Sequence, residues 1–329
     1  LKPGSNATNF SAPNLQYFMD SPTKIGELQL REWTVTNPDN KKYNFRLAFE
    51  GEATPAQLDT FAAKLHRMVL EAKAVYGELP AFDYGIYTFI ASINPYVKGD
   101  GMEHRNSTMI TIPRKFDGSD ALLGVFSHEF FHCWNVERIR PADLEPFNFE
   151  KSNMSEGLWL AEGFTQYYGD IILKRAGLIS EEEFWGEMSR LVNTKINTSG
   201  AQKYSPVENS QRAVFVDAGV AIDKTNYPNK YSSYYTYGGA TAMALDMELR
   251  SKYNNGSLDN FMRELWKRFG KTGKPYTVEA LEPALAAVSD ADFAASFFRR
   301  YIYGHESFDY AAALQQANIK LQPVDGNKA

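Results

Sequence analysis

Residues 124–141 read GVFSHEFFHCWNVERIRP. The two histidines of HEFFH, His128 and His132, are four residues apart, and residues at i and i+4 of an α-helix lie on one face, one turn apart. They can therefore share one metal ion. Glu129 is offset from His128 by about 100 degrees, because a helix has 3.6 residues per turn. It would thus flank the ion, where a general base for an activated water should lie.

The surroundings of this motif predict a buried helix. The apolar run ALLGVF precedes it, and Phe130 and Phe131 stand between its polar residues. A buried polar stripe needs a partner, and a metal ion supplies one. The chain has only 5 His in 329 residues, so a chance HExxH is uncommon. The alternative, two histidines that fall on a core helix by accident, stays open on the motif alone.

A catalytic zinc ion usually takes three protein ligands and leaves a fourth position for water. Residues 157–177, GLWLAEGFTQYYGDIILKRAG, have helical spacing of their apolar positions and offer Glu162. An unpaired carboxylate beside Trp159 would be costly. We therefore expect Glu162 to be the third ligand, with Glu156 and Asp170 as alternatives.

Composition limits the classes of function. With 43% hydrophobic and 23% charged residues, the chain matches ordinary soluble domains, and its length suits about two of them. No apolar run approaches the roughly 18 residues of a membrane span. The net charge of −5 without a basic patch argues against a nucleic-acid partner. Cys133 is the single cysteine, so neither an intramolecular disulfide nor a cysteine-based zinc site is expected.

The hydrophobic periodicity predicts an α+β fold. We expect a β-containing N-terminal lobe, in which the HEFFH helix follows the last strand, and a mostly helical C-terminal lobe. The expected strands are 26–36, 41–51, 82–93 and 107–113, and residues 94–106 are expected to be a connection. The expected helices are 54–77, 157–177, 180–195, 235–253, 257–270, 277–289 and 290–304.

Two separated motifs resemble a known peptidase family. HEFFH together with WLAEGF resembles the gluzincin peptidases. HEFFHCWNVERIRP with YYTYGGATAMALDMELR, residues 234–250, resembles more narrowly the glycyl aminopeptidases, over about residues 15–320. The resemblance implies a thermolysin-like zinc peptidase catalytic domain with one catalytic zinc ion. It also implies a bacterial periplasmic or secreted enzyme.

The resemblance also suggests how the chain is divided. Family members often carry a PDZ domain, expected after about residue 320, and this chain is expected to lack it. The expected parts are a β-rich opening segment that is the remnant of an N-terminal β domain (1–50), an α/β lobe with both ligand helices (51–177), a helical lobe (178–305) and a C-terminal tail (306–329).

The same family implies a donor for the tetrahedral oxyanion. Residues 233–239, SYYTYGG, stand where related enzymes have Tyr-x-Lys-Gly. Tyr235 matches the tyrosine of that motif and is the expected catalytic donor. Tyr237 stands in place of the lysine, and Tyr234 is an adjacent alternative.

A further match concerns substrate binding. The stretch GDGMEHRNS occupies the position of the Gly-x-Met-Glu-Asn motif of aminopeptidases. Gly101, Met102 and Glu103 are therefore expected to bind substrate, with Glu103 holding the free amino group by a charge-assisted hydrogen bond. Arg138 and Arg140 are candidates to bind a substrate carboxylate.

The expected function is a zinc aminopeptidase that removes a small N-terminal residue, Gly or Ala, from peptides with a free N-terminus. A metal-activated water would attack, and Glu129 would act as general base. Two alternatives remain: a zinc endopeptidase of the same fold and a non-catalytic peptide-binding protein. Two His and one Glu also suit other divalent ions. The sequence leaves the oligomeric state open.

Overall fold

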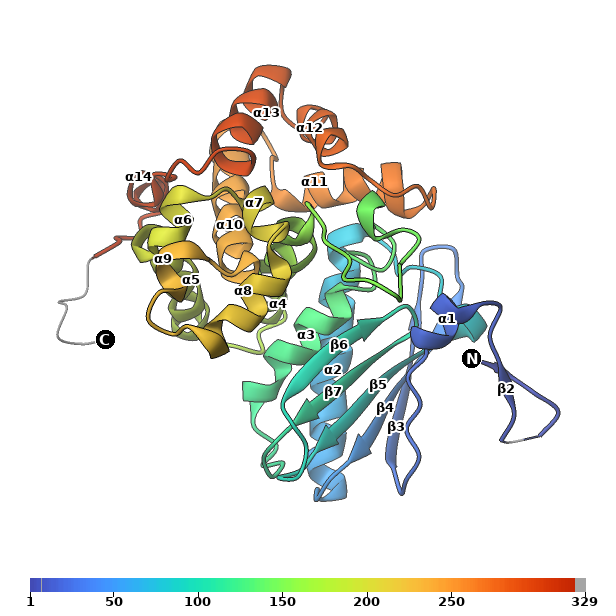
Figure 1. The fold of residues 1–329 in the computed structure, drawn as a ribbon. Coiled ribbons are helices and arrows are strands. Elements are labelled where there is room, and N and C mark those ends of the chain that lie inside the picture. The colour runs from blue at the N-terminus through green and yellow to red at the C-terminus, as the bar shows by residue number, and fades with distance from the viewer. Residues whose placement is uncertain (7, 323–329) are drawn as a thin grey trace. The chain divides into compact units, whose positions relative to one another are not determined.

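The computed structural model describes residues 1–6 and 8–322, which fall into two compact units (Figure 1). The expected tail 306–329 is therefore described only as far as residue 322. Of the described residues, unit 1 contains those in Leu1–Arg140, Tyr168–Phe184 and Phe269–Pro275, and unit 2 contains those in Pro141–Tyr167, Trp185–Arg268 and 276–322.

Unit 1 is built on a five-stranded mixed sheet. Its elements are β1 (Lys2–Pro3), β2 (Phe10–Ser11), α1 (Leu15–Met19), β3 (Gln29–Thr36), β4 (Lys42–Glu50), α2 (Pro55–Tyr76), the 3-10 turn η1 (Asp83–Gly85), β5 (Ile86–Ile93), β6 (Asp100–His104), β7 (Ser107–Ile112), η2 (Asp120–Leu122) and α3 (Leu123–Phe131). The strand order is β3-β4-β5-β7-β6. The outer pairs β3–β4 and β6–β7 are antiparallel, whereas β5 runs parallel to β4 and β7.

Helices α2 and α3 cover one face of this sheet (Figure 1). Aromatic side chains fill the layer between them: Phe45 and Phe89 contact Phe130 of α3, with ring centroids 5.8 and 5.6 Å apart. Helix α2 begins and ends as the sequence predicts. Thr54 forms a capping box with Gln57, and Gly77 ends the helix in the left-handed region at φ 83°.

Residues 94–106 are more than the expected connection, because Asp100–His104 form strand β6 at the edge of the sheet. This prediction was wrong. Glycine and aspartate disfavour strands, but pairing with β7 across the turn after His104 overrides that preference, with Gly101 opposite Ile110 and Glu103 opposite Thr108. The segment expected to bind substrate therefore has a defined strand register.

Unit 2 is mostly helical. Within the chain from residue 141 to 322, the helices are η3 (Ala142–Leu144), the π-helical η4 (Trp159–Phe164), α4 (Thr165–Arg175), α5 (Glu181–Asn197), α6 (Ser199–Lys203), α7 (Pro206–Ser210), α8 (Ala213–Ile222), α9 (Tyr227–Lys230), α10 (Tyr234–Lys252), α11 (Leu258–Leu265), η5 (Trp266–Gly270), α12 (Val278–Ala286), α13 (Ala291–Phe297), η6 (Phe298–Ile302) and α14 (Tyr310–Gln316). The part of α4 that starts at Tyr168, the first residues of α5 and the end of η5 belong to unit 1. None of the described helices combines the length and apolar character that crossing a membrane requires.

Two helices of unit 2 approach each other through glycines. A Cβ atom added at Gly163 of η4 would lie 2.6 Å from the carbonyl carbon of Gly238 in α10, and one at Gly238 would lie 2.8 Å from Cα of Gly163. No side chain fits at such distances, so both positions require glycine. This crossing holds the helix of Glu162 against the helix that begins with Tyr234 and Tyr235.

Candidate active site

Helix α3 carries the HEFFH motif on an apolar support. Phe130 and Phe131 are fully buried, so the backbone of the motif is fixed by the core. His132 follows the last residue of α3 but keeps helical angles, φ −59° and ψ −17°. The rings of His128 and His132 therefore lie together, with centroids 4.7 Å apart, as their spacing predicts.

The orientation of His132 is set by the backbone. Its Nδ1 lies 2.7 Å from the carbonyl oxygen of Asn135. A carbonyl oxygen only accepts, so this nitrogen carries the proton and Nε2 keeps its lone pair. Imidazole in this tautomer is a metal ligand, and a hydrogen bond to the other nitrogen is the usual support for it. A backbone partner leaves no trace in the residue pattern, so the sequence could not reveal it.

The expected third ligand comes near the two histidines. Ligand atoms of His128, His132 and Glu162 all lie within 4.8 Å of one another. The alternatives Glu156 and Asp170 do not belong to this group. Glu162 lies in the π-helical stretch η4, which the sequence did not predict and which is a frequent feature of functional sites.

The segment from Tyr168 onward, within unit 1, packs directly on the HEFFH helix. The ring of Tyr168 stacks on Phe131 with centroids 4.3 Å apart. A Cβ at Gly169 would lie 3.5 Å from Cα of His128, which is ordinary contact distance. Helix α4 thus fits closely against the HEFFH helix at His128 and Phe131.

Strand β6 brings two of the expected substrate residues to Glu129. A carboxylate oxygen of Glu103, one of Glu129 and a nitrogen of His132 lie within 4.8 Å of one another. At Gly101 an added Cβ would collide with Oε1 of Glu129 and lie 2.9 Å from its Cδ. Gly101 therefore leaves the space in which the Glu129 carboxylate sits. Glu129 itself is 6% exposed.

Met102 is placed differently. Successive side chains of a strand point to opposite faces, so Met102 faces away from Glu129, and it is 52% exposed. The structure does not bring its side chain to the other candidate residues. His104 lies on the same face as Met102, and its Nδ1 is 3.0 Å from Oδ1 of Asp20, which also accepts the backbone N–H of Arg105 at 3.2 Å. These bonds fix the turn that follows Glu103.

Other carboxylates lie near Glu103, together with two arginines. Burial raises the pKa of Glu137 to about 7, and the charges of Asp20 and Glu103 add to the shift. The positive charges of Arg140 and Arg138 oppose it. Several carboxylates in one region favour a cationic ligand such as an ammonium group.

Arg138 is a structural residue, which contradicts its interpretation as a substrate ligand. Its guanidinium donates to the carbonyl oxygens of Cys133 at 2.6 Å, Ala81 at 2.6 Å and Arg105 at 3.2 Å. The side chain is almost fully buried. It therefore ties the turn after α3 to the turn beside β6.

In unit 2 the two adjacent tyrosines, Tyr234 and Tyr235, differ in their burial and packing. Tyr234 is buried, and its Oη donates to Oδ2 of Asp217 at 2.7 Å. A hydroxyl has one proton, so this bond occupies the donor of Tyr234. Tyr235 is only partly buried and stacks on Tyr234 with ring centroids 5.0 Å apart.

Residues 121–240 match the M61 glycyl aminopeptidase family. We call this matched segment, a little over a third of the chain, the M61 domain. It includes the HEFFH motif, Glu162 and Tyr235, whereas Gly101 and Glu103 precede it. No curated protein matches the chain in sequence.

Solved structures share the fold of the M61 domain and its flanks. An aminopeptidase N family protein from Idiomarina loihiensis is 25% identical with a TM-score of 0.75, over 88% of this chain and 49% of that one. An M1 zinc metallopeptidase from Deinococcus radiodurans is 16% identical with a TM-score of 0.54, over 85% and 53%. The same enzyme has been solved with a Tyr-Ser-Ala substrate.

Native yeast LTA4 hydrolase is also 16% identical, with a TM-score of 0.55 over 88% of this chain and 47% of that one. The fold is therefore the thermolysin-like fold of the M1 peptidases, an α+β fold as predicted. The chain spans about half the length of the solved structures that it matches.

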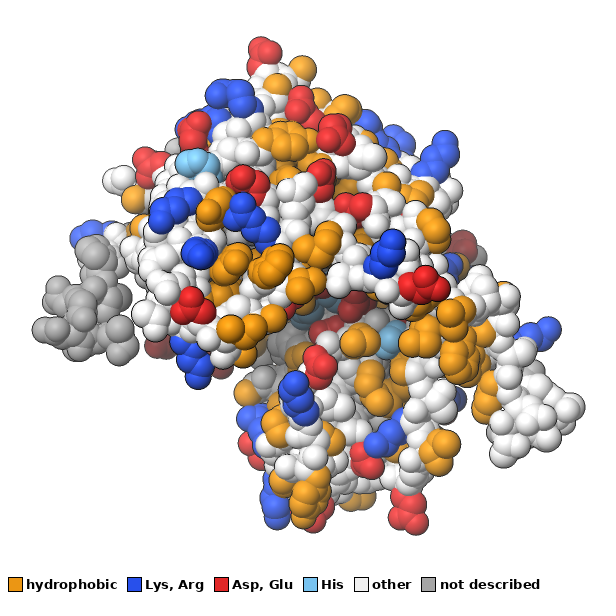
Figure 2. Space-filling model, in the orientation of Figure 1, with side chains coloured by type: hydrophobic (Ala, Val, Ile, Leu, Met, Phe, Trp, Pro, Cys, Tyr) orange, Lys and Arg blue, Asp and Glu red, His pale blue; other side chains and the backbone are white. Residues whose placement is uncertain are grey.

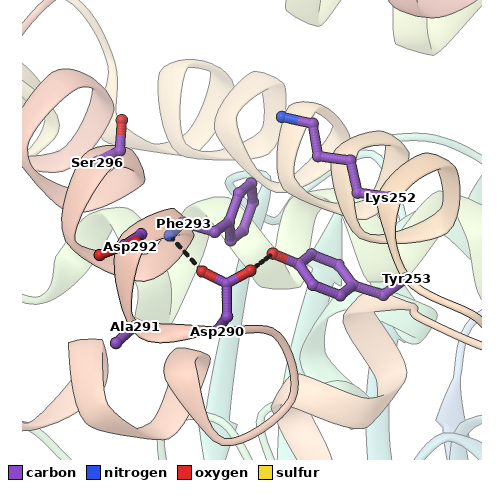
Figure 3. Close-up of a pocket in the computed structure, with 7 residues that line it drawn as sticks. All are labelled: Lys252, Tyr253, Asp290, Ala291, Asp292, Phe293 and Ser296. Atoms are coloured by element: carbon purple, nitrogen blue, oxygen red, sulfur yellow. Dashed lines mark hydrogen bonds between the residues drawn. The ribbon is translucent and has the colours of Figure 1, made fainter.

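A pocket of about 610 Å³ lies elsewhere in unit 2, after the M61 domain (Figure 3). Its polar groups bond to one another: Tyr253 donates to Asp290, which also accepts the backbone N–H of Phe293 at 2.8 Å. None of the site residues expected from the sequence lines it. Its lining consists of Lys252, Tyr253, Asp290, Ala291, Asp292, Phe293 and Ser296.

Proposed function

We propose that this protein is a zinc-dependent aminopeptidase that removes a small N-terminal residue, Gly or Ala, from peptides. The observation that carries the proposal is the grouping of His128, His132 and Glu162 within 4.8 Å, with Glu129 beside it and Glu103 within the same distance of Glu129 and His132. The small-residue preference comes from the glycyl aminopeptidase family to which the M61 domain belongs.

The donor set suits zinc. Two imidazoles and one carboxylate are a common ligand set of catalytic zinc, and the tautomer of His132 leaves Nε2 for the ion. When bound, zinc polarises a carbonyl group and lowers the pKa of water towards about 7. A single ion is proposed, held by His128, His132 and Glu162.

Glu129 is proposed as the general base. It would take the proton of the attacking water and return it to the leaving amine. Its burial keeps bulk water away, and Gly101 leaves room for its carboxylate. Tyr235 is proposed as the second donor to the oxyanion, because the hydroxyl of Tyr234 is occupied by Asp217.

Glu103 is proposed to bind the substrate ammonium. Its carboxylate lies within 4.8 Å of that of Glu129, and a positive charge between them would relieve their repulsion. Strand β6 is the outer strand of the described sheet, so its edge can pair with an extended substrate backbone. Gly101 and Met102 would contribute through their backbone groups.

The test is hydrolysis of Gly- and Ala-initiated peptides, each with a free and an acetylated N-terminus, by zinc-loaded protein. Glu129→Gln is the control, and it should bind zinc but lose turnover. Cleavage of only the free forms, absent in the control, is expected. Cleavage of both forms would instead establish an endopeptidase. Cleavage of neither, with zinc bound, would reject catalysis and favour a peptide-binding protein.

A further inference from the structure

Hydrogen bonds within unit 1 join the N-terminal segment to the turn beside the proposed ammonium site. Arg105 and Asn106 form this two-residue turn between β6 and β7. Oδ1 of Asp20, the residue after α1, lies 3.0 Å from Nδ1 of His104 and accepts the backbone N–H of Arg105 at 3.2 Å. A carboxylate oxygen only accepts, so Nδ1 of His104 is the donor. One side chain, 84 residues before His104, therefore holds both the end of β6 and the start of the turn.

A second contact of α1 reaches the same turn. Oδ2 of Asp83 accepts the hydroxyl of Tyr17 at 2.9 Å. The same oxygen accepts Nε–H of Arg105 at 3.3 Å and Nδ2–H of Asn106 at 3.1 Å. Helix α1 is thus linked to the turn twice, directly through Asp20 and indirectly from Tyr17 through Asp83.

Polar bonds rather than burial fix the position of α1. The helix has five residues and none of them is buried; Phe18 and Met19 are 54% and 55% exposed. Figure 2 shows hydrophobic side chains at the surface where Figure 1 draws α1. Such a short helix has little stability of its own. Beyond Asp20, Lys24 pairs with Glu50 at the end of β4, with 2.6 Å between Nζ and Oε2, so the segment is held on both sides of Asp20.

The geometry of β6 makes Glu103 depend on this anchor. In the described sheet β6 is the outermost strand and is paired on one side, with β7. The side chains of Glu103 and His104 point to opposite faces of the strand. The carboxylate of Glu103 lies within 4.8 Å of ligand atoms of Glu129 and His132. Asp20 bonds to the strand from the other face and therefore acts on Glu103 through the backbone.

We propose that Asp20 is a positioning residue for the binding of the substrate ammonium group. By holding His104 and Arg105 it fixes where β6 ends, and so it sets the distance between the carboxylates of Glu103 and Glu129. This inference rests on the proposed function, and it makes the N-terminal segment part of the recognition of a free N-terminus. Loss of the anchor would displace the ammonium ligand and leave the other groups in place, so it should weaken binding more than the chemical step.

The test compares two substitutions of Asp20 on Gly-Ala-Ala amide with a free N-terminus. Asp20→Ala removes the acceptor and should raise KM about 10-fold, while kcat stays within about threefold of wild type. Asp20→Asn keeps an Oδ1 that can accept both bonds but carries no charge, so both constants should stay within about threefold of wild type. Asp59→Ala is the matched control and should change neither constant, because it removes an ion pair with Arg31 at the opposite edge of the sheet.

A double substitution separates positioning from a general loss of structure. In a Glu103→Gln protein, Asp20→Ala should raise KM by less than about twofold more, because the group that Asp20 positions has already lost its charge. Additive losses would overturn the inference. An equal loss in Asp20→Asn and Asp20→Ala would also overturn it, because the effect would then come from charge. Loss of zinc or of the circular dichroism signal in Asp20→Ala would assign Asp20 to folding and overturn it as well.

Binding separates this inference from the proposed function. Calorimetry measures the Kd of free and acetylated Gly-Ala-Ala amide for zinc-loaded Glu129→Gln protein, with and without Asp20→Ala. A Kd about 10-fold weaker for the free peptide alone supports the inference. If the wild type shows no turnover, that result rejects the peptidase and keeps the ammonium site. Turnover of the free peptide by the wild type, with the same Kd in both proteins, overturns the inference and leaves the proposed function intact. Absence of binding together with absence of turnover rejects both.

Discussion

Replacing Gly101 by Ala should remove most of the activity without removing zinc. The added methyl group would collide with Oε1 of Glu129 and lie 2.9 Å from its Cδ and 3.0 Å from Cγ2 of Val125, whereas ordinary contacts begin at 3.4 Å. Glu129 is 6% exposed, so its carboxylate has little room and must shift by about 0.5 to 1 Å. A misplacement of about 1 Å can cost roughly 100-fold in rate, which corresponds to about 2.7 kcal/mol in the activation barrier.

The assay is kcat for a free Gly-initiated peptide, together with zinc content by atomic emission and the fold by circular dichroism. Gly124→Ala is the matched control on the HEFFH helix. Nothing lies within 4 Å of an added Cβ there, so it should keep kcat and stabilise the protein by about 0.5–1 kcal/mol. A Gly101→Ala protein with wild-type kcat would refute the placement of Glu129 as base. Loss of zinc in that variant would refute the assignment of the effect to the base alone.

Four further changes have defined outcomes. Glu162→Gln should weaken zinc binding at least about 100-fold in chelator competition, and wild-type affinity would remove it from the ligand set. Tyr235→Phe should lower kcat about 100-fold, but Tyr234→Phe less than about threefold, and the reverse order would exchange their roles. Arg138→Met should lower the free energy of unfolding in urea by about 3 kcal/mol or more, since three carbonyl oxygens lose its donors. Burial lowers the pKa of Lys195 to about 8, so the unfolded chain binds more protons than the folded protein between pH 8 and 10.5. The stability of the wild type relative to Lys195→Met should therefore rise with pH across that window, by up to about 3 kcal/mol. A difference in stability that does not change with pH would contradict the lowered pKa.

The parts of the site that depend on side-chain identity could be predicted from the sequence. The spacing of His128 and His132 gives their common face, and the apolar setting of Glu162 singles it out from Glu156 and Asp170. Strand β6 could not be predicted, because its stability comes from pairing with β7 while its own residues disfavour a strand. The partner of His132 is a backbone carbonyl, which no residue pattern records.

Helices α6 to α9 were also missing from the prediction, although one of them has a local signal. Ser205 and Glu208 form a capping box with Pro206 at the first helical position of α7. Helix α8 lacks such a signal. Its exposed face is as apolar as its buried face, so it shows no amphipathic period.

The bond from His132 to the carbonyl of Asn135 means that no side-chain substitution at position 135 can delete the acceptor. Ordinary mutational scanning will therefore miss it, and Asn135→Ala should bind zinc normally. The hydrogen bond of His132 can instead be broken by a change in the backbone path of residues 132–139. Arg138 fixes that path by donating to the carbonyl oxygen of Cys133. If His132 binds zinc as proposed, engineering the site for another metal should therefore vary the length and curvature of that turn, because the turn decides which nitrogen His132 offers.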